Sequence, residues 1–178
     1  MSRIVTPSVE SATGATADLF AQIRKAAGTV PNAYAAIGAL DPSALKAMLA
    51  ADAALAGSTL SRQDRETVKL IVSEVAGCDY CVAAHSQMGK LAGLSSGVLK
   101  QIRDDEPTGD AKRDALILFV RTLAQTHGTL SEQDYAAIKA AGYTDAQLVA
   151  ISLAFAVITF TNVFNRINDT VVDFPAVA

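Results

Sequence analysis

The sequence predicts an all-α fold, and three observations support this prediction. Apolar residues make up 51% of the 178 residues, yet only 6% are aromatic and Trp is absent. Alanine and leucine, which favour helices over strands, therefore supply most of the hydrophobicity. Apolar residues also recur at helical spacing, and β-type alternation never continues for more than a few residues. The length suits a single domain over residues 1–178 with about eight helices.

In the first half, each predicted helix lies between a start signal and a stop signal. Asp41 provides an N-cap before Pro42, a residue suited to the first helical position. Ser61 places a hydroxyl three residues before Asp64, as in a capping box, and Gly77 is the natural terminator of that helix. The predicted helices of this half are, in order, about 15–27, 30–39, 42–56, 62–76, 78–91 and 95–102.

The second half repeats this pattern after an exposed acidic loop at residues 104–107. The segment Leu130-Ser131-Glu132-Gln133-Asp134 echoes Leu60-Ser61-Arg62-Gln63-Asp64, which suggests two weakly similar halves. Thr144 and Gln147 form a further capping box. The predicted helices of this half are about 110–127, 131–141 and 145–168.

Charge and hydropathy exclude several classes of partner. The formal net charge is -3, and no basic cluster indicates binding to nucleic acid. The apolar run 148–164 is shorter than the roughly 20 residues that a bilayer requires, so we predict a buried core helix and no membrane span. The N-terminus lacks the apolar run of a secretory signal, so we place the protein in the cytoplasm. There, a C-x-x-C pair favours redox or metal chemistry over a static crosslink.

Both cysteines and one of the two histidines fall in residues 65–85. Cys78, Cys81 and His85 lie at positions i, i+3 and i+7, which share one face of a helix. Both cysteines lie in the first turn after Gly77, where free backbone N–H groups and the helix dipole favour a thiolate. His85 can accept the thiol proton, and a second cysteine can capture an oxidised sulfur as a disulfide. The pattern therefore predicts redox chemistry at this stripe.

A carboxylate is needed to orient the histidine, and Glu66 is the better candidate. If the chain folds back at Gly77, Glu66 lies about 16 Å before the hinge and His85 about 12 Å after it, so the two face each other. Glu74 is too close to the hinge and becomes a secondary member of the site, facing Cys78 or Tyr80. The competing interpretation of Glu66 is a solvated charge among basic neighbours.

Glu66 followed by Gly77-Cys78-Asp79-Tyr80-Cys81-Val82-Ala83-Ala84-His85 resembles the signature E-x11-C-x-x-C-x-x-x-H. This is the motif of the AhpD-like alkylhydroperoxidases within the carboxymuconolactone decarboxylase family. Three flanking segments also resemble the peroxidase-related members: Val30-Pro31-Asn32, Leu60-Ser61 and Asn162-Val163-Phe164-Asn165. The similarity spans most of the chain, with the C-x-x-C core at about 40–125.

The resemblance implies an all-helical subunit that assembles into trimers or hexamers and reduces organic hydroperoxides without a cofactor. It implies that Cys81 is the peroxidatic thiol and Cys78 the resolving thiol, which receives electrons from a dithiol donor such as a lipoyl or thioredoxin-like protein. His85 and Glu66 would form the proton relay. Tyr80 stands where the best-known members have a second histidine, and a tyrosine is a poor base near neutrality. Because the decarboxylase branch lacks paired cysteines, lactone decarboxylation is disfavoured.

Two alternatives stay open from the sequence. A metal site would use Cys78, Cys81 and His85 with His127 or Glu66 as a fourth ligand, although structural zinc usually adds a second paired motif. A non-enzymatic protein would be a helical oligomer whose cysteines only pack or sense redox state.

Three polar residues outside the motif receive no catalytic role. His127 lies at a predicted helix end, where a cation is favourable, so we interpret it as structural. Asn162 and Asn165 lie at i and i+3 in the apolar helix. We expect them to hydrogen-bond in the core or across a subunit interface, or to mark the point where the helix reaches solvent.

Overall fold

The computed structural model describes residues 2–176, and within them it contains nine α-helices, one short 3-10 helix and no strand. The all-α prediction is confirmed: the nine helices correspond to the nine predicted ranges, one more than the rough count of eight. The elements, in order, are η1 (Val9–Ser11), α1 (Gly14–Ala27), α2 (Asn32–Leu40), α3 (Pro42–Ala56), α4 (Arg62–Ala76), α5 (Asp79–Leu91), α6 (Ser96–Asp104), α7 (Ala111–Gln125), α8 (Glu132–Ala140) and α9 (Asp145–Asn168).

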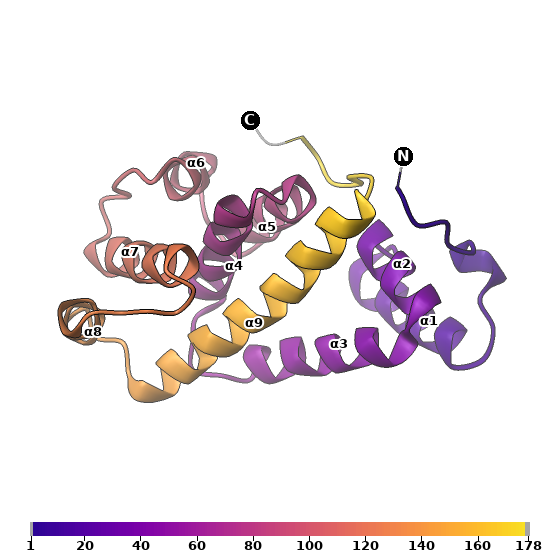
Figure 1. The fold of residues 1–178 in the computed structure, drawn as a ribbon, viewed down its shortest axis with the longest axis horizontal. Helices are drawn as coiled ribbons and strands as arrows, with labels where there is room; N and C mark the ends of the chain where they lie inside the picture. Colours follow the sequence, from indigo (N-terminus) through magenta and orange to yellow (C-terminus); the bar gives the residue numbers. More distant parts are fainter. Residues whose placement is uncertain (1, 177–178) are drawn as a thin grey trace.

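The long helix α9 crosses the molecule diagonally, with α1–α3 on one side and α6–α8 on the other (Figure 1). Helix α4 is the central element, because it packs against α5, α7 and α9. All of its residues from Thr67 to Ser73 are buried, and one continuous apolar core surrounds it. Packing on several sides therefore fixes the position of the helix that carries Glu66.

Side-chain caps start the helices where the sequence places them. Asp41 accepts hydrogen bonds from two backbone N–H groups of α3, at 2.9 and 3.0 Å. The Ser61 hydroxyl accepts from the backbone N–H of Asp64 at 3.0 Å. Reciprocal capping boxes are present at Ser131–Asp134 and Thr144–Gln147. These bonds satisfy N–H groups that would otherwise lack a partner at each helix start.

The chain reverses between α4 and α5 at Gly77, as predicted. Gly77 adopts a left-handed conformation, with φ 61° and ψ 43°. The reversal is fastened to α9, because a guanidinium nitrogen of Arg166 donates to the carbonyl oxygens of Ala76 and Gly77. A Cβ atom at position 77 would lie 2.8 Å from that nitrogen. Both the backbone angle and the close contact therefore favour glycine here.

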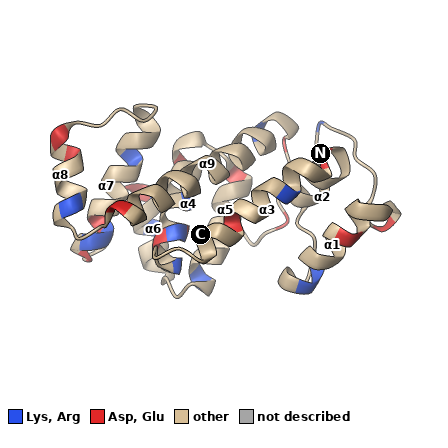
Figure 2. Cartoon of the chain, turned by 90° about the horizontal axis from the view of Figure 1, so that it is seen from below, with Lys and Arg blue, Asp and Glu red and all other residues tan. Residues whose placement is uncertain are grey.

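The apolar helix predicted as a buried core element is buried on only part of its surface. Helix α9 packs against α3, α4 and α5, yet Val149, Val163 and Ile167 are more than half exposed. Figure 2 draws most of α9 in tan, because Asp145 and Arg166 are its only charged side chains. By length and composition alone, α9 is also the one helix among residues 2–176 that could cross a bilayer. Its packing on three helices makes it part of the folded domain.

Candidate active site

The structure brings Glu66 and His85 together across the α4–α5 reversal. The Nδ1 atom of His85 lies 2.8 Å from Oε2 of Glu66, and the two side chains are 16% and 12% exposed. Burial would raise the pKa of Glu66, but the hydrogen bond and charge of His85, with the charges of Lys69 and Arg62, hold it below its ordinary value. Glu66 is therefore a carboxylate that fixes one ring nitrogen and leaves Nε2 of His85 for another partner.

Cys78 and Cys81 are free thiols at the start of α5, and each is 2% exposed. Cys78 is the N-cap residue. Its sulfur accepts hydrogen bonds from the Cys81 thiol and backbone N–H, and these bonds, helped by the charge of Arg166, lower the pKa of Cys78. The same thiol–thiol hydrogen bond, together with burial, raises the pKa of Cys81. Within the pair, Cys78 therefore ionises more readily than Cys81.

Helix α9 contributes two residues to the site that sequence reasoning missed. The amide nitrogen of Asn165 lies 3.3 Å from Sγ of Cys81 and donates to it, while Oγ1 of Thr161 lies 4.0 Å from the same sulfur. Asn165 is 4% exposed. The expectation that Asn165 hydrogen-bonds in the core or at an interface therefore omitted its contact with the Cys81 sulfur. Two asparagines in an apolar helix were the available signal, but the sequence does not say which helix they face.

A tyrosine from α2 also belongs to the surroundings of the site. Burial raises the pKa of Tyr34, and the negative charges of Asp52, Glu66 and Cys81 raise it further. Tyr34 is therefore a neutral hydroxyl close to both the relay carboxylate and a thiol. Asp52 pairs in turn with Lys69 at 2.6 Å. No motif marked Tyr34, because only the packing of α2 brings it near α4 and α5.

The structure does not bring Tyr80 or Glu74 into this cluster. The hydroxyl oxygen of Tyr80 accepts a hydrogen bond from the backbone N–H of Ala33 at 3.1 Å, and its ring packs edge-on against Phe174. Glu74 pairs with Arg103 of α6 at 3.8 Å, and burial raises its pKa. The expectation that Glu74 faces Cys78 or Tyr80 is therefore wrong, since an ion pair holds it toward α6.

The geometry offers little to a metal ion. Among residues 2–176, no group of three or more His, Cys, Asp or Glu side chains is arranged to hold one. His127, one of the two suggested fourth ligands, follows the end of α7 with φ 56° and lines a pocket that neither cysteine lines.

Fold and site together define a helical protein with a paired thiol, a histidine and a carboxylate on an α-hairpin. Residues 42–116 match the model of the Carboxymuconolactone decarboxylase family, and this segment contains that hairpin. The expected resemblance to this family is confirmed over these 75 of the 178 residues. A search of curated proteins found no match.

Solved structures show the same fold at low identity. An uncharacterized peroxidase-related protein from Ralstonia eutropha JMP134, described as an alkylhydroperoxidase AhpD core, is 21% identical with a TM-score of 0.84, covering 97% of this chain and 92% of that chain. An uncharacterized peroxidase-related protein from Silicibacter sp. TM1040 is 20% identical with a TM-score of 0.84, covering 96% and 91%.

A third structure shows how varied the proteins with this fold are. A cysteine-to-alanine variant of the debrominase Bmp8, in complex with 2,3,4-tribromopyrrole, is 16% identical with a TM-score of 0.82, covering 97% of this chain and 93% of that chain. The fold therefore does not by itself specify the substrate.

Proposed function

We propose that this protein is a thiol-dependent peroxidase that reduces organic hydroperoxides through Cys78 and Cys81. The observation that carries the proposal is the hydrogen-bonded thiol pair, with Asn165 donating to the Cys81 sulfur and the Glu66–His85 pair on the same helical hairpin. A static packing role would not require a donor on one sulfur and a lowered pKa on the other. Perturbed titration at a buried cluster is typical of functional sites.

The first step is attack on the peroxide by Cys81. When the proton in the thiol–thiol hydrogen bond moves to Cys78, the negative charge moves to Cys81, where the Asn165 amide stabilises it. The Cys81 thiolate attacks the terminal oxygen of ROOH, an S–O bond forms, and the O–O bond breaks. The leaving alkoxide takes a proton from His85, which Glu66 orients, and departs as the alcohol.

The second step closes the disulfide. Cys78 attacks the sulfenic acid on Cys81, an S–S bond forms, and the displaced hydroxide leaves as water with the Cys78 proton. A dithiol donor then reduces the disulfide, and its two protons return to Cys81 and His85. Each cycle thus converts one hydroperoxide and one dithiol into an alcohol, water and a disulfide. The chemistry requires no further cofactor.

The setting of this activity completes the proposal. A soluble location in the reducing cytoplasm would keep the thiols supplied with electrons from a lipoyl or thioredoxin-like dithiol. We also propose a homo-oligomer, because Val149, Phe160, Val163 and Ile167 are exposed along α9 at spacings typical of helix-helix contact.

Turnover of a small hydroperoxide tests the proposal. With cumene hydroperoxide and a dithiol, Cys81→Ser should abolish turnover, and His85→Gln should slow it strongly. Comparing dihydrolipoamide, thioredoxin and glutathione as reductants identifies the donor. Equal activity of the wild type and Cys81→Ser would refute the thiol mechanism.

Alkylation separates the enzyme from a protein whose cysteines only pack. At pH 7, Cys78 should react faster with iodoacetamide than a free thiol model does, because its pKa is lowered. If neither cysteine reacts faster than the model thiol, the activated pair does not exist.

Metal content tests the remaining alternative. Zinc near one equivalent in protein purified without chelator would favour a metal-binding protein instead.

A further inference from the structure

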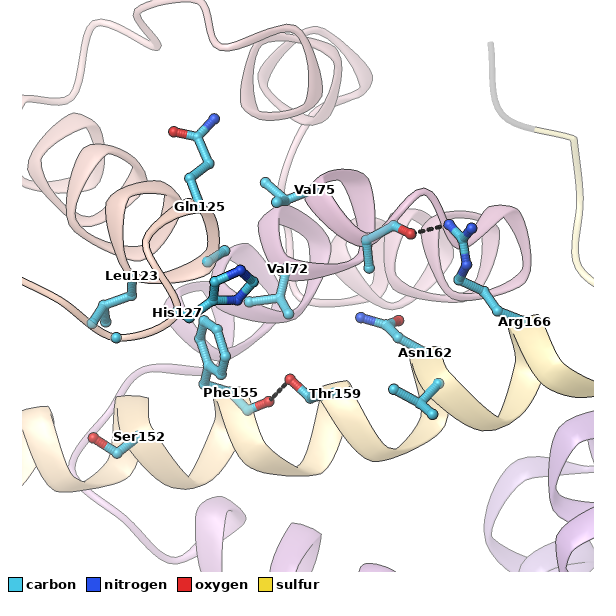
Figure 3. Close-up of a pocket in the computed structure, with 14 residues that line it drawn as sticks. Val72, Val75, Leu123, Gln125, His127, Ser152, Phe155, Thr159, Asn162 and Arg166 are labelled. Atoms are coloured by element: carbon cyan, nitrogen blue, oxygen red, sulfur yellow. Dashed lines mark hydrogen bonds between the residues drawn. The ribbon is translucent and has the colours of Figure 1, made fainter.

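A cavity that neither cysteine lines opens between α4, α7 and α9 (Figure 3). Its volume is about 700 Å³, within the range of small-molecule sites. The walls are mainly apolar and come from three helices. They include Val72 and Val75 of α4, Leu123 and Ala124 of α7, and Phe155 of α9. Neither cysteine, nor Glu66, nor His85 lines it.

One polar group in this cavity lacks a partner. Asn162 is 2% exposed, and its side-chain oxygen accepts from the Ser73 hydroxyl at 3.1 Å. Its amide nitrogen has no hydrogen-bond partner. Figure 3 shows Asn162 projecting from α9 toward α4, beside the space that the cavity residues enclose. A buried amide that remains unpaired is costly, so a bound acceptor would remove that cost.

The charges around the cavity indicate the sign of that acceptor. Arg166 lies one turn beyond Asn162 on α9 and lines the same cavity, as does the imidazole of His127. None of the lining residues is acidic. The cavity therefore combines apolar walls with donors and a permanent positive charge, which is complementary to an apolar molecule that carries an anionic group.

We propose that this cavity binds a small amphiphilic carboxylate, with its apolar chain against Val75, Leu123 and Phe155 and its carboxylate accepting from Asn162 and Arg166. Binding here does not depend on the proposed peroxidase activity, because no thiol takes part. The Asn162 amide gains the acceptor that it lacks in the unliganded protein. Lysine-like cationic amphiphiles are disfavoured, since Arg166 repels them and the Asn162 nitrogen cannot accept.

Calorimetric titration of the full chain with octanoate at pH 7 tests this proposal, with octylamine as the probe of opposite charge. We expect one octanoate per chain and at least tenfold weaker binding of octylamine. Asn162→Leu, which keeps the volume and removes the donor, should weaken octanoate about tenfold, as the loss of one buried hydrogen bond predicts. Ala124→Phe, which fills the cavity, should abolish binding.

Two comparisons keep the test decisive. Ala124→Phe alters only a partly buried wall position, so it provides a readout even if Asn162→Leu fails to fold. Cys81→Ser should bind octanoate like the wild type, which separates this site from the thiol pair. The proposal is overturned if the wild type shows no saturable binding, if octylamine binds equally, if Ala124→Phe binds unchanged, or if Cys81→Ser loses binding.

Discussion

The contact between Asn165 and Cys81 makes a prediction that separates a role in catalysis from a role in folding. Asn165→Leu keeps the side-chain volume nearly constant and removes the amide that donates to the sulfur at 3.3 Å. It also removes the side-chain oxygen Oδ1 of Asn165, which is buried and has no hydrogen-bond partner. The rate of peroxide attack should therefore fall while the stability of the fold changes little.

The magnitudes follow from the charge on the sulfur. A hydrogen bond to a charged group contributes about 1.5–3 kcal/mol. If this bond strengthens as Cys81 becomes a thiolate, its loss slows peroxide attack about ten- to a hundredfold, since about 1.4 kcal/mol corresponds to a factor of ten. Replacing an unpaired buried oxygen by a methyl group is close to neutral for folding. We therefore expect the free energy of unfolding to change by less than about 1 kcal/mol.

The assay is single-turnover oxidation with cumene hydroperoxide, paired with urea unfolding of the same samples. Thr67→Val is the matched control, because Thr67 is fully buried on α4 and its hydroxyl also lacks a partner, so it forms no hydrogen bond with a cysteine. This control should keep the wild-type rate. A rate within about threefold of wild type for Asn165→Leu, or a rate loss that merely follows unfolding, would refute the reasoning.

Two further predictions concern residues of the motif. Tyr80→Phe should destabilise the fold by about 1–3 kcal/mol, because the buried N–H of Ala33 loses its acceptor. The peroxidase rate of the folded protein should stay unchanged. A slower rate without destabilisation would show that Tyr80 takes part in proton transfer. The lowered pKa of Glu66 predicts stability that is fully present above its ordinary pKa of 4.5 and is lost as the pH falls below it. Urea midpoints between neutral and acidic pH should show this loss for the wild type, and Glu66→Gln should reduce the pH dependence.

Local signals explain why the helices could be predicted so well. A cap such as Asp41 and a terminator such as Gly77 act within a few residues of themselves, so the chain carries that information directly. The pairing of Glu66 with His85 was also accessible, because one reversal at a known glycine and the helical rise per residue place the two opposite each other.

The remainder of the site depends on contacts between distant segments. Asn165 follows Cys81 by 84 residues, and Tyr34 precedes it on a helix whose direction no local pattern specifies. Tyr80 faces away from the relay because the start of α2 is close enough to donate to its hydroxyl. Sequence spacing identified the chemistry of the hairpin, but only the packing of α2 and α9 onto it decides which side chains reach the sulfur.

The contacts of helix α9 limit which amino-acid substitutions this protein can tolerate. One side of the helix places Asn165 and Thr161 next to Cys81. A second side places Asn162 and Arg166 at the cavity, and Arg166 also donates to the carbonyl oxygen of Gly77. The outer side carries exposed apolar residues. Nine of its 24 residues are buried, and these are the positions that neighbouring elements constrain. A saturation-mutagenesis map should therefore show intolerant positions on the inner side of α9, Thr161 and Asn165 among them, even though the helix contains none of the C-x-x-C motif residues.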